Sequence, residues 1–164
     1  MVARRRVVPA LVALLVVLAG CTGTVANVAN DDEYDRTTVT VVDERGAELG
    51  TVDARVADTY SKRYTGLSDT ESLGENEGML FVHDSEGQYA YVMREMAFPI
   101  DIVFIAANGT VTRIHHAELP PRGTSESELR RYRGTGNYVL EVPYGWTDDH
   151  DVCEGDTVEI AGDY

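Results

Sequence analysis

The sequence predicts an all-β domain, a jelly-roll-like β-sandwich of two sheets with one or two short helices. From Thr37 onward, turn residues interrupt the chain about every 8 to 12 residues, the spacing typical of short antiparallel strands. The segments between these turns alternate apolar and polar residues and are rich in β-branched side chains. Helical spacing is confined to short stretches, which argues against an α-helical or α/β fold.

The first predicted elements are a hairpin and a short helix. β-branched residues alternate along 37–43, and the turn ERG joins this strand to a second one at 48–58. Residues 59–69 break the period of two. Aromatic and leucine side chains recur there at helical spacing, and Gly66 stands near the end, so we expect a short helix.

The middle of the chain predicts two strand pairs. The apolar segment 77–84 and the segment 88–95 are expected to form strands joined by a turn at DSEG. Strands at 100–106 and 110–119 flank an Asn-Gly dipeptide, a strong signal for a tight hairpin turn.

The last third of the domain begins with the long polar segment 120–136, in which we expect one helical turn at 125–131. Strands are predicted at 137–142 and 156–162, with a loop or short helix between them.

Residues 1–20 predict an export signal rather than part of this fold. Three arginines precede the apolar stretch VVPALVALLVVLAG, which is shorter than the roughly 20 apolar residues of a spanning helix. The stretch ends in LAGC, similar to the lipobox of exported lipoproteins, so we expect a lipid on Cys21. The arginine run also resembles a twin-arginine signal. A plain signal peptide or an uncleaved anchor is the alternative.

The predicted domain organisation follows from this leader. Residues 21–36 would be the lipidated cysteine and a flexible polar tether, and residues 37–164 a single domain. The domain would lie outside the cell, anchored to the cytoplasmic membrane through the lipid. Cys153 would then be the only thiol, and we expect it to be inert and partly buried.

The charge of the chain excludes one class of partner. Lys and Arg number 14 against 28 Asp and Glu, a net charge of -14. Such an excess repels phosphate backbones, so no nucleic acid is expected as a partner. Lys62 is the single lysine, and this acidic, lysine-poor composition suggests a surface adapted to concentrated salt. An ordinary acidic protein is the alternative.

Three blocks carry a family resemblance: RYTGLSD…ENEGMLFVHD (63–84), YVMREMAFPIDIVFI (91–105) and YVLEVPYG…CEGDTV (138–158). They resemble the exported family called domain of unknown function 192, here as a haloarchaeal lipoprotein member. The resemblance covers roughly residues 39 to 160 and implies a jelly-roll-type sandwich with no established activity. Matching motif positions are Arg63, Gly66, Leu67, Gly78, Met79, Leu80, Phe81, Met93, Pro99, Asp101, Glu141, Gly155 and Asp156. Departures from the motif are Ser68, Val92, Glu95 and Met96.

The candidate ligand-site residues are Arg63, Met93, Asp101, Glu141 and Asp156. Asp101 stands out because both faces of its predicted strand are apolar, so its carboxylate is expected to be part-buried and to need a partner. Arg63 or Arg94 could form that ion pair. Alternatively, Asp101 could accept hydrogen bonds from loop N–H groups, or contact a ligand at the mouth of the sandwich.

The sequence contains no signature of catalysis. No G-x-S-x-G, H-E-x-x-H or phosphate-loop motif occurs, and we expect no catalytic residue, cofactor or metal. His115 and His116 are adjacent on a strand and would point to opposite faces. We therefore expect a non-enzymatic module that binds a small molecule, a glycan or a protein. The alternatives are an extracytoplasmic hydrolase using Asp101, Glu141 and a histidine, and a purely structural envelope component.

Overall fold

Seven strands form one mixed β-sheet in the computed structural model, which describes residues 34–162 and 164. The strands are β1 (Arg36–Val42), β2 (Glu48–Ala57), β3 (Glu77–Tyr91), β4 (Ile100–Ile105), β5 (Val111–Ala117), β6 (Tyr132–Pro143) and β7 (Thr157–Ile160). The helical segments are α1 (Tyr60–Thr65), the 3-10 turn η1 (Glu126–Glu128) and α2 (Trp146–Asp149). The predicted all-β class with two short helices is confirmed.

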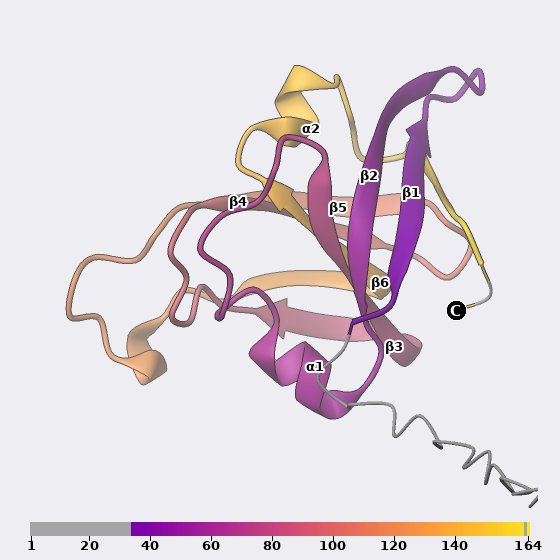
Figure 1. The fold of residues 1–164 in the computed structure, drawn as a ribbon. Coiled ribbons are helices and arrows are strands. Elements are labelled where there is room, and N and C mark those ends of the chain that lie inside the picture. The colour runs from indigo at the N-terminus through magenta and orange to yellow at the C-terminus, as the bar shows by residue number, and fades with distance from the viewer. Residues whose placement is uncertain (1–33, 163) are drawn as a thin grey trace, which may run out of the picture.

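The sheet curls until its two edge strands meet (Figure 1). The strand order is β5-β4-β6-β3-β2-β1-β7, and every neighbouring pair is antiparallel except β2 and β3. At one end the edges join: Thr110 pairs with Thr157, and the N–H of Val158 donates to the carbonyl of Gly109 at 2.7 Å. The strands that the sequence analysis assigned to two sheets of a jelly-roll-like sandwich thus form one continuous sheet. This sheet is a half-barrel whose opposite walls face each other.

The parallel contact between β2 and β3 explains the position of α1. Antiparallel neighbours can be joined by a tight turn, but parallel strands require a crossover connection. Here α1 is part of that crossover and lies beside β3 (Figure 1). Thr59 caps its start by accepting from the N–H of Lys62 at 3.2 Å, and Gly66 ends it with a φ of 54°.

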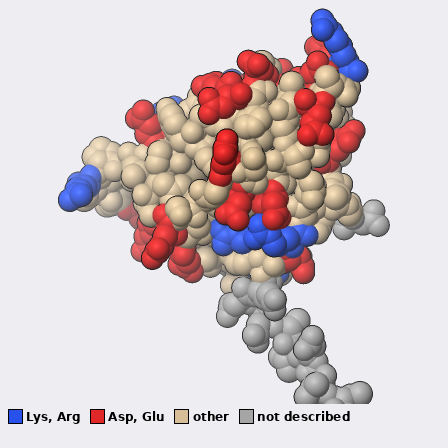
Figure 2. All heavy atoms as spheres, turned by 45° about the horizontal axis from the view of Figure 1, so that its top comes forward, with Lys and Arg blue, Asp and Glu red and all other residues tan. Residues whose placement is uncertain are grey.

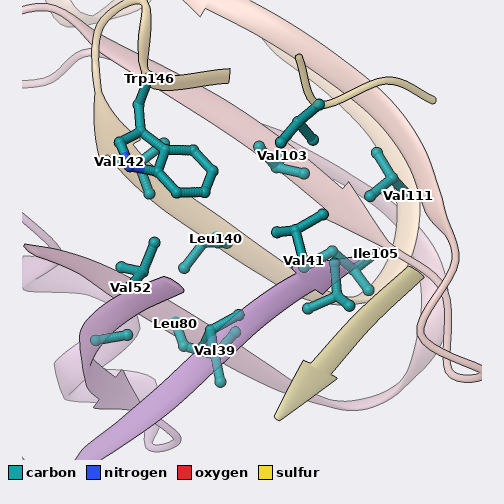
Figure 3. Close-up of a cluster of buried hydrophobic side chains, with 13 residues drawn as sticks. Val39, Val41, Val52, Leu80, Val103, Ile105, Val111, Leu140, Val142 and Trp146 are labelled. Atoms are coloured by element: carbon teal, nitrogen blue, oxygen red, sulfur yellow. The ribbon is translucent and has the colours of Figure 1, made fainter. Parts of the chain in front are cut away.

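Two apolar clusters lie on the two faces of the sheet. The first fills the interior of the curl, where side chains of opposite walls meet and the indole of Trp146 covers one end (Figure 3). The second lies on the other face of β3, β4 and β6, beneath α1 and the segment that follows β3. Burial on both faces accounts for the apolar sequence of β4, in which Asp101 is the one polar residue.

One predicted turn is wrong. Residues DSEG do not separate two strands, because β3 continues through them to Tyr91 and pairs with β6 on both sides. The register shifts between Val82 and Gly87, so the exposed polar residues form a bulge without reversing the chain. Correspondingly, β6 begins at Tyr132 rather than at the predicted residue 137.

The hairpin at the Asn-Gly dipeptide is confirmed. β4 and β5 are antiparallel partners, with Ile100 opposite Ala117 at one end and Ile105 opposite Val111 at the other. In the turn between them, Gly109 adopts a φ of 86°, a conformation that favours glycine. The predicted signal peptide, Cys21 and most of the tether lie outside the described residues. Within residues 34–162 and 164, we find no helix with the length and apolarity needed to cross a bilayer.

Candidate functional site

A cavity of about 320 Å³ lies between α1 and the outer face of β3 and β6. Its walls come from four places: α1 with the turn after it, β3, the segment that follows β3, and Glu141 of β6. Because α1 belongs to the β2–β3 crossover, the same connection that makes these strands parallel also builds one wall of the cavity.

Glu141 lines this cavity from β6. In register it lies opposite Met79 of β3 and Ile102 of β4, so its carboxyl is surrounded by the second apolar cluster. The residue is 5% exposed, and no described group donates a hydrogen bond to its carboxyl. Burial raises the pKa of Glu141 from 4.5 to about 8. The carboxyl group of Glu141 is therefore largely in its neutral, protonated form at neutral pH.

Arg63 lines the same cavity from α1. One guanidinium nitrogen, Nη1, donates to the carbonyls of Asp58 at 2.6 Å and Val82 at 2.7 Å. These bonds hold the guanidinium between α1 and β3. No carboxylate of the described chain lies within ion-pair distance of it, and Lys62, not Arg63, pairs with the carboxylate of Asp58. The charge of Arg63 is thus fixed in place without an acidic partner.

His83 and Tyr91 form a hydrogen-bonded pair on the β3 wall. The imidazole Nε2 lies 3.0 Å from the phenol oxygen, and the ring stacks on Tyr89 at 3.5 Å. Burial, and then the charge of Arg63, lower the pKa of His83 to about 4, so the imidazole is neutral at neutral pH. Burial raises the pKa of Tyr91. The pair therefore offers neutral polar atoms beside the two ionisable groups.

The mouth of the cavity is aromatic. Tyr60 and Tyr64 are 79% and 60% exposed, and their rings stack with centroids 6.3 Å apart. The guanidinium of Arg94 lies 3.9 Å from the centre of the Tyr64 ring and donates to the Tyr64 carbonyl. Its Nη1 also lies 3.9 Å from Glu126, while its Nε is buried without a partner. Such exposed rings provide flat apolar surface next to solvent.

Asp101 is fully buried, but it does not pair with either predicted arginine. One carboxylate oxygen accepts from Nδ1 of His116 at 2.8 Å and from the N–H of Gly145 at 3.1 Å. The other accepts from the N–H and the hydroxyl of Thr147 at 3.0 and 2.6 Å. Asp101 thus holds the loop that starts α2, which was the alternative interpretation of this residue. Arg63 and Arg94 instead line the cavity on the other face of the sheet.

The two buried carboxyls cannot act on one reacting atom. Asp101 pairs in register with Val142, whose side chain lies in the interior cluster, whereas Glu141 faces the outer cluster. Adjacent strand residues point to opposite faces, so the sheet separates the two groups. The hydrolase arrangement of Asp101, Glu141 and a shared histidine is therefore wrong.

The remaining predicted residues lie apart from this cavity. Met93 is buried in the outer cluster and borders a second cavity of about 460 Å³ below the 118–130 segment. Asp156 accepts from the N–H of Cys153 at 2.7 Å and supports the turn before β7. Cys153 itself is exposed, so the prediction that it is partly buried is wrong. Of the five candidates, the structure brings Arg63 and Glu141 together.

His83, Tyr91 and Arg94 were missed as site residues. The signal available for Tyr91 was the alternation of tyrosines along β3, which places Tyr89 and Tyr91 on the same face. His115 and His116 do point to opposite faces, as predicted: His115 packs near Tyr132, and His116 bonds Asp101. Within the described residues, no three His, Cys, Asp or Glu side chains gather in a metal-binding arrangement.

Comparisons with known proteins place this geometry in a wider context. The model of the DUF192 family, described as an uncharacterized ACR, matches residues 40–160. A Sinorhizobium meliloti 1021 protein proposed as a transcription regulator has a similar structure, with a TM-score of 0.70 and 26% identity over 80% of this chain and 98% of its own. A Novosphingobium aromaticivorans protein of unknown function has a TM-score of 0.68 and 24% identity over 79% and 88%. None of the curated proteins matches the sequence.

Proposed function

The chain belongs to the DUF192 family, and we propose that this member is an exported, lipid-anchored module that binds a small molecule in the cavity between α1 and the sheet. It would bind without chemical turnover, through the groups that line this cavity.

The observation that carries the proposal is the state of Glu141. A buried polar group without a hydrogen bond costs free energy of about 1–3 kcal/mol. The other fully buried acid, Asp101, has four donors, whereas Glu141 has none among the described residues and lines a cavity. A carboxyl that contributes no structural bond and faces open volume is the expected feature of a binding site.

Export and anchoring are supported by the leader. The basic head, the short apolar run and LAGC end at Cys21, and the family match begins only at residue 40. The leader therefore lies outside the part of the chain that the family shares. Mass spectrometry of membrane fractions should find a chain that starts at Cys21 with lipid on its sulfur, and Cys21→Ser should release it. An intact Met1 would contradict the anchor.

We do not extend the description of the Sinorhizobium protein as a proposed transcription regulator to this chain. The net charge here is -14, and acidic side chains are spread over the face shown in Figure 2. Such a surface repels the phosphate backbone of DNA.

Ligand-observed NMR with a mixed fragment library tests the proposed binding. We expect fragments that compete with one another for one site in the full chain, and we expect Glu141→Ala to weaken them by about tenfold or more. Glu159→Ala is the control, because Glu159 is an exposed acid on β7 and does not line the cavity. Fragments that bind equally well to the Glu141 variant, or a complete absence of binding, would contradict a ligand site here.

A further inference from the structure

We propose that the ligand of this cavity is a small zwitterion, with the carboxylate and the ammonium group of an amino acid. In the complex, Arg63 would bind the carboxylate and Glu141 the ammonium. This inference rests on the proposed binding function and adds the chemical class of the ligand.

The first step is that the cavity contains a cationic side chain and an acidic side chain that do not pair with each other. Arg63 and Glu141 both line it, yet no nitrogen of Arg63 comes within 4.0 Å of the Glu141 carboxyl. Arg63 is held by carbonyls of Asp58 and Val82, so it is not free to swing across to the acid. The two groups are therefore presented separately to whatever occupies the space between them.

The second step is elimination by charge. A ligand that is only an anion would pair with Arg63 and could accept a hydrogen bond from protonated Glu141, but it would repel the carboxylate form of this residue. A ligand that is only a cation would pair with Glu141 but face the positive charge of Arg63. A zwitterion satisfies both groups at once, and buried charges are tolerated when paired and hydrogen-bonded.

The third step concerns the rest of the ligand. The walls beside the two charged groups are apolar or aromatic, including Leu67, Phe81 and Tyr91. An ammonium group is also attracted to the faces of aromatic rings. A volume of about 320 Å³ is at the small end of ligand pockets, which suits a single amino acid better than a peptide or a glycan.

The fourth step links binding to a proton. Glu141 is mostly neutral when the cavity is empty, because burial raises its pKa to about 8. An ammonium group beside it favours the carboxylate, so binding below about pH 8 should release a proton. The ionisable groups that share the cavity are Tyr60, Arg63 and Tyr64 of α1, His83, Tyr89 and Tyr91 of β3, and Arg94. Of these, His83 is already neutral above about pH 6 because its pKa is lowered to about 4, and burial raises the pKa of Tyr91, so neither should contribute a proton to binding near pH 8.

Calorimetry with matched probes tests the proposal. The zwitterions are glycine, L-leucine and L-phenylalanine. 4-Methylpentanoate and 3-phenylpropanoate lack the ammonium group, and 3-methylbutylamine and 2-phenylethylamine lack the carboxylate. We expect at least one zwitterion to bind about tenfold tighter than either of its analogues. Its affinity should rise by up to about tenfold per pH unit from about pH 6 to 8 and then level off.

The variants separate the two charged contacts. Glu141→Gln should abolish both the proton release and the pH dependence, and Arg63→Met should remove the preference for the zwitterion over the amine. Arg113→Met is the matched control, since Arg113 is exposed and pairs with Glu154 outside the cavity. If Arg63→Met does not fold, the Glu141 variant and the pH series still decide.

Two outcomes overturn the inference. In one, an anionic analogue binds as tightly as the zwitterion and loses affinity above about pH 8. In the other, none of the three zwitterions binds. If fragments still compete for the cavity in the NMR experiment, the binding function stands and only the ligand class is wrong. If fragments fail as well, both proposals fall.

Discussion

At the scale of single residues, this sheet contains two buried carboxyls with opposite surroundings. Asp101 accepts four hydrogen bonds from β5 and the start of α2, whereas Glu141 accepts none from the described chain. Burial alone costs free energy for both groups. The first is compensated within the fold and so has a structural role, while the second is the group that we propose for ligand binding.

Asp101→Asn should therefore destabilise the domain. An amide has one oxygen and one NH2 group, so at least one donor of the loop would face another donor. We expect a loss of about 1–3 kcal/mol in the free energy of unfolding, measured by urea denaturation in concentrated salt. Asp149→Asn is the control, because Asp149 lies on the same short helix, is exposed and forms no side-chain hydrogen bond or ion pair with the described chain. A loss no larger than the control's would show that the four bonds do not stabilise the loop.

Glu141→Gln should instead stabilise the domain, and the size of this gain should increase with pH. The folded-state pKa is raised above 4.5 to about 8, so the folded chain binds more protons than the unfolded chain between these values. The contribution of Glu141 to stability therefore falls as pH rises through this window. We expect the variant to be at least about 1 kcal/mol more stable than the wild type at pH 8, and this advantage to vanish below about pH 4. Equal stability at both pH values would mean that Glu141 is hydrated.

At the scale of elements, the sequence predicts those strands, turns and helices that local residue alternation and turn residues determine. The β4–β5 hairpin has an Asn-Gly turn between apolar strands, and α1 has its cap and its terminal glycine. The start of β6 was missed because its glycines lack β-propensity. They are there for packing: a Cβ at Gly134 would come 2.3 Å from the Phe104 ring.

The candidate site was only partly predictable for a related reason. The family motif marks Arg63 and Glu141, but nothing local in the sequence shows that α1 and β6 approach each other. That approach depends on the parallel pairing of β2 with β3, a contact between distant segments. Asp101 was predicted to be part-buried and is fully buried, and its partners at Gly145 and Thr147 come from a loop whose position depends on the curl of the sheet.

Gly78→Ala tests how tightly β3 packs against β6 next to the site. A Cβ there would lie 2.6 Å from the backbone oxygen of Glu141 and 2.9 Å from Val52, so the two strands would have to separate. We expect a loss of about 1–3 kcal/mol in unfolding free energy. Gly74→Ala is the comparison, since its Cβ would meet only the flexible side chain of Glu77 at 3.3 Å. An alanine at 78 that costs no more than one at 74 would contradict this close packing.

At the scale of the whole molecule, the acidic charge lies almost entirely on the surface. Asp101, Glu141 and Asp156 are the buried acids of the described chain, and the other acidic side chains are spread over the exterior (Figure 2). Without residues 1–20 the net charge becomes -17, since three of the 14 basic residues lie in that segment. Folding brings these surface charges together, so their repulsion weighs more on the folded state than on the unfolded chain.

Thermal stability should therefore rise with salt. The screening length falls from about 30 Å at 0.01 M to about 3 Å at 1 M, which is shorter than the typical spacing of surface charges. Ion pairs such as Arg36–Asp53 are screened as well, but exposed pairs contribute only about 0–1 kcal/mol each, and acids outnumber bases two to one. We expect the melting temperature at neutral pH to increase steadily from about 0.05 to 3 M KCl. Mild acid should partly replace salt in dilute buffer, because it protonates crowded carboxylates. A melting temperature that stays flat across the KCl series would mean that the acidic excess does not adapt the surface to salt.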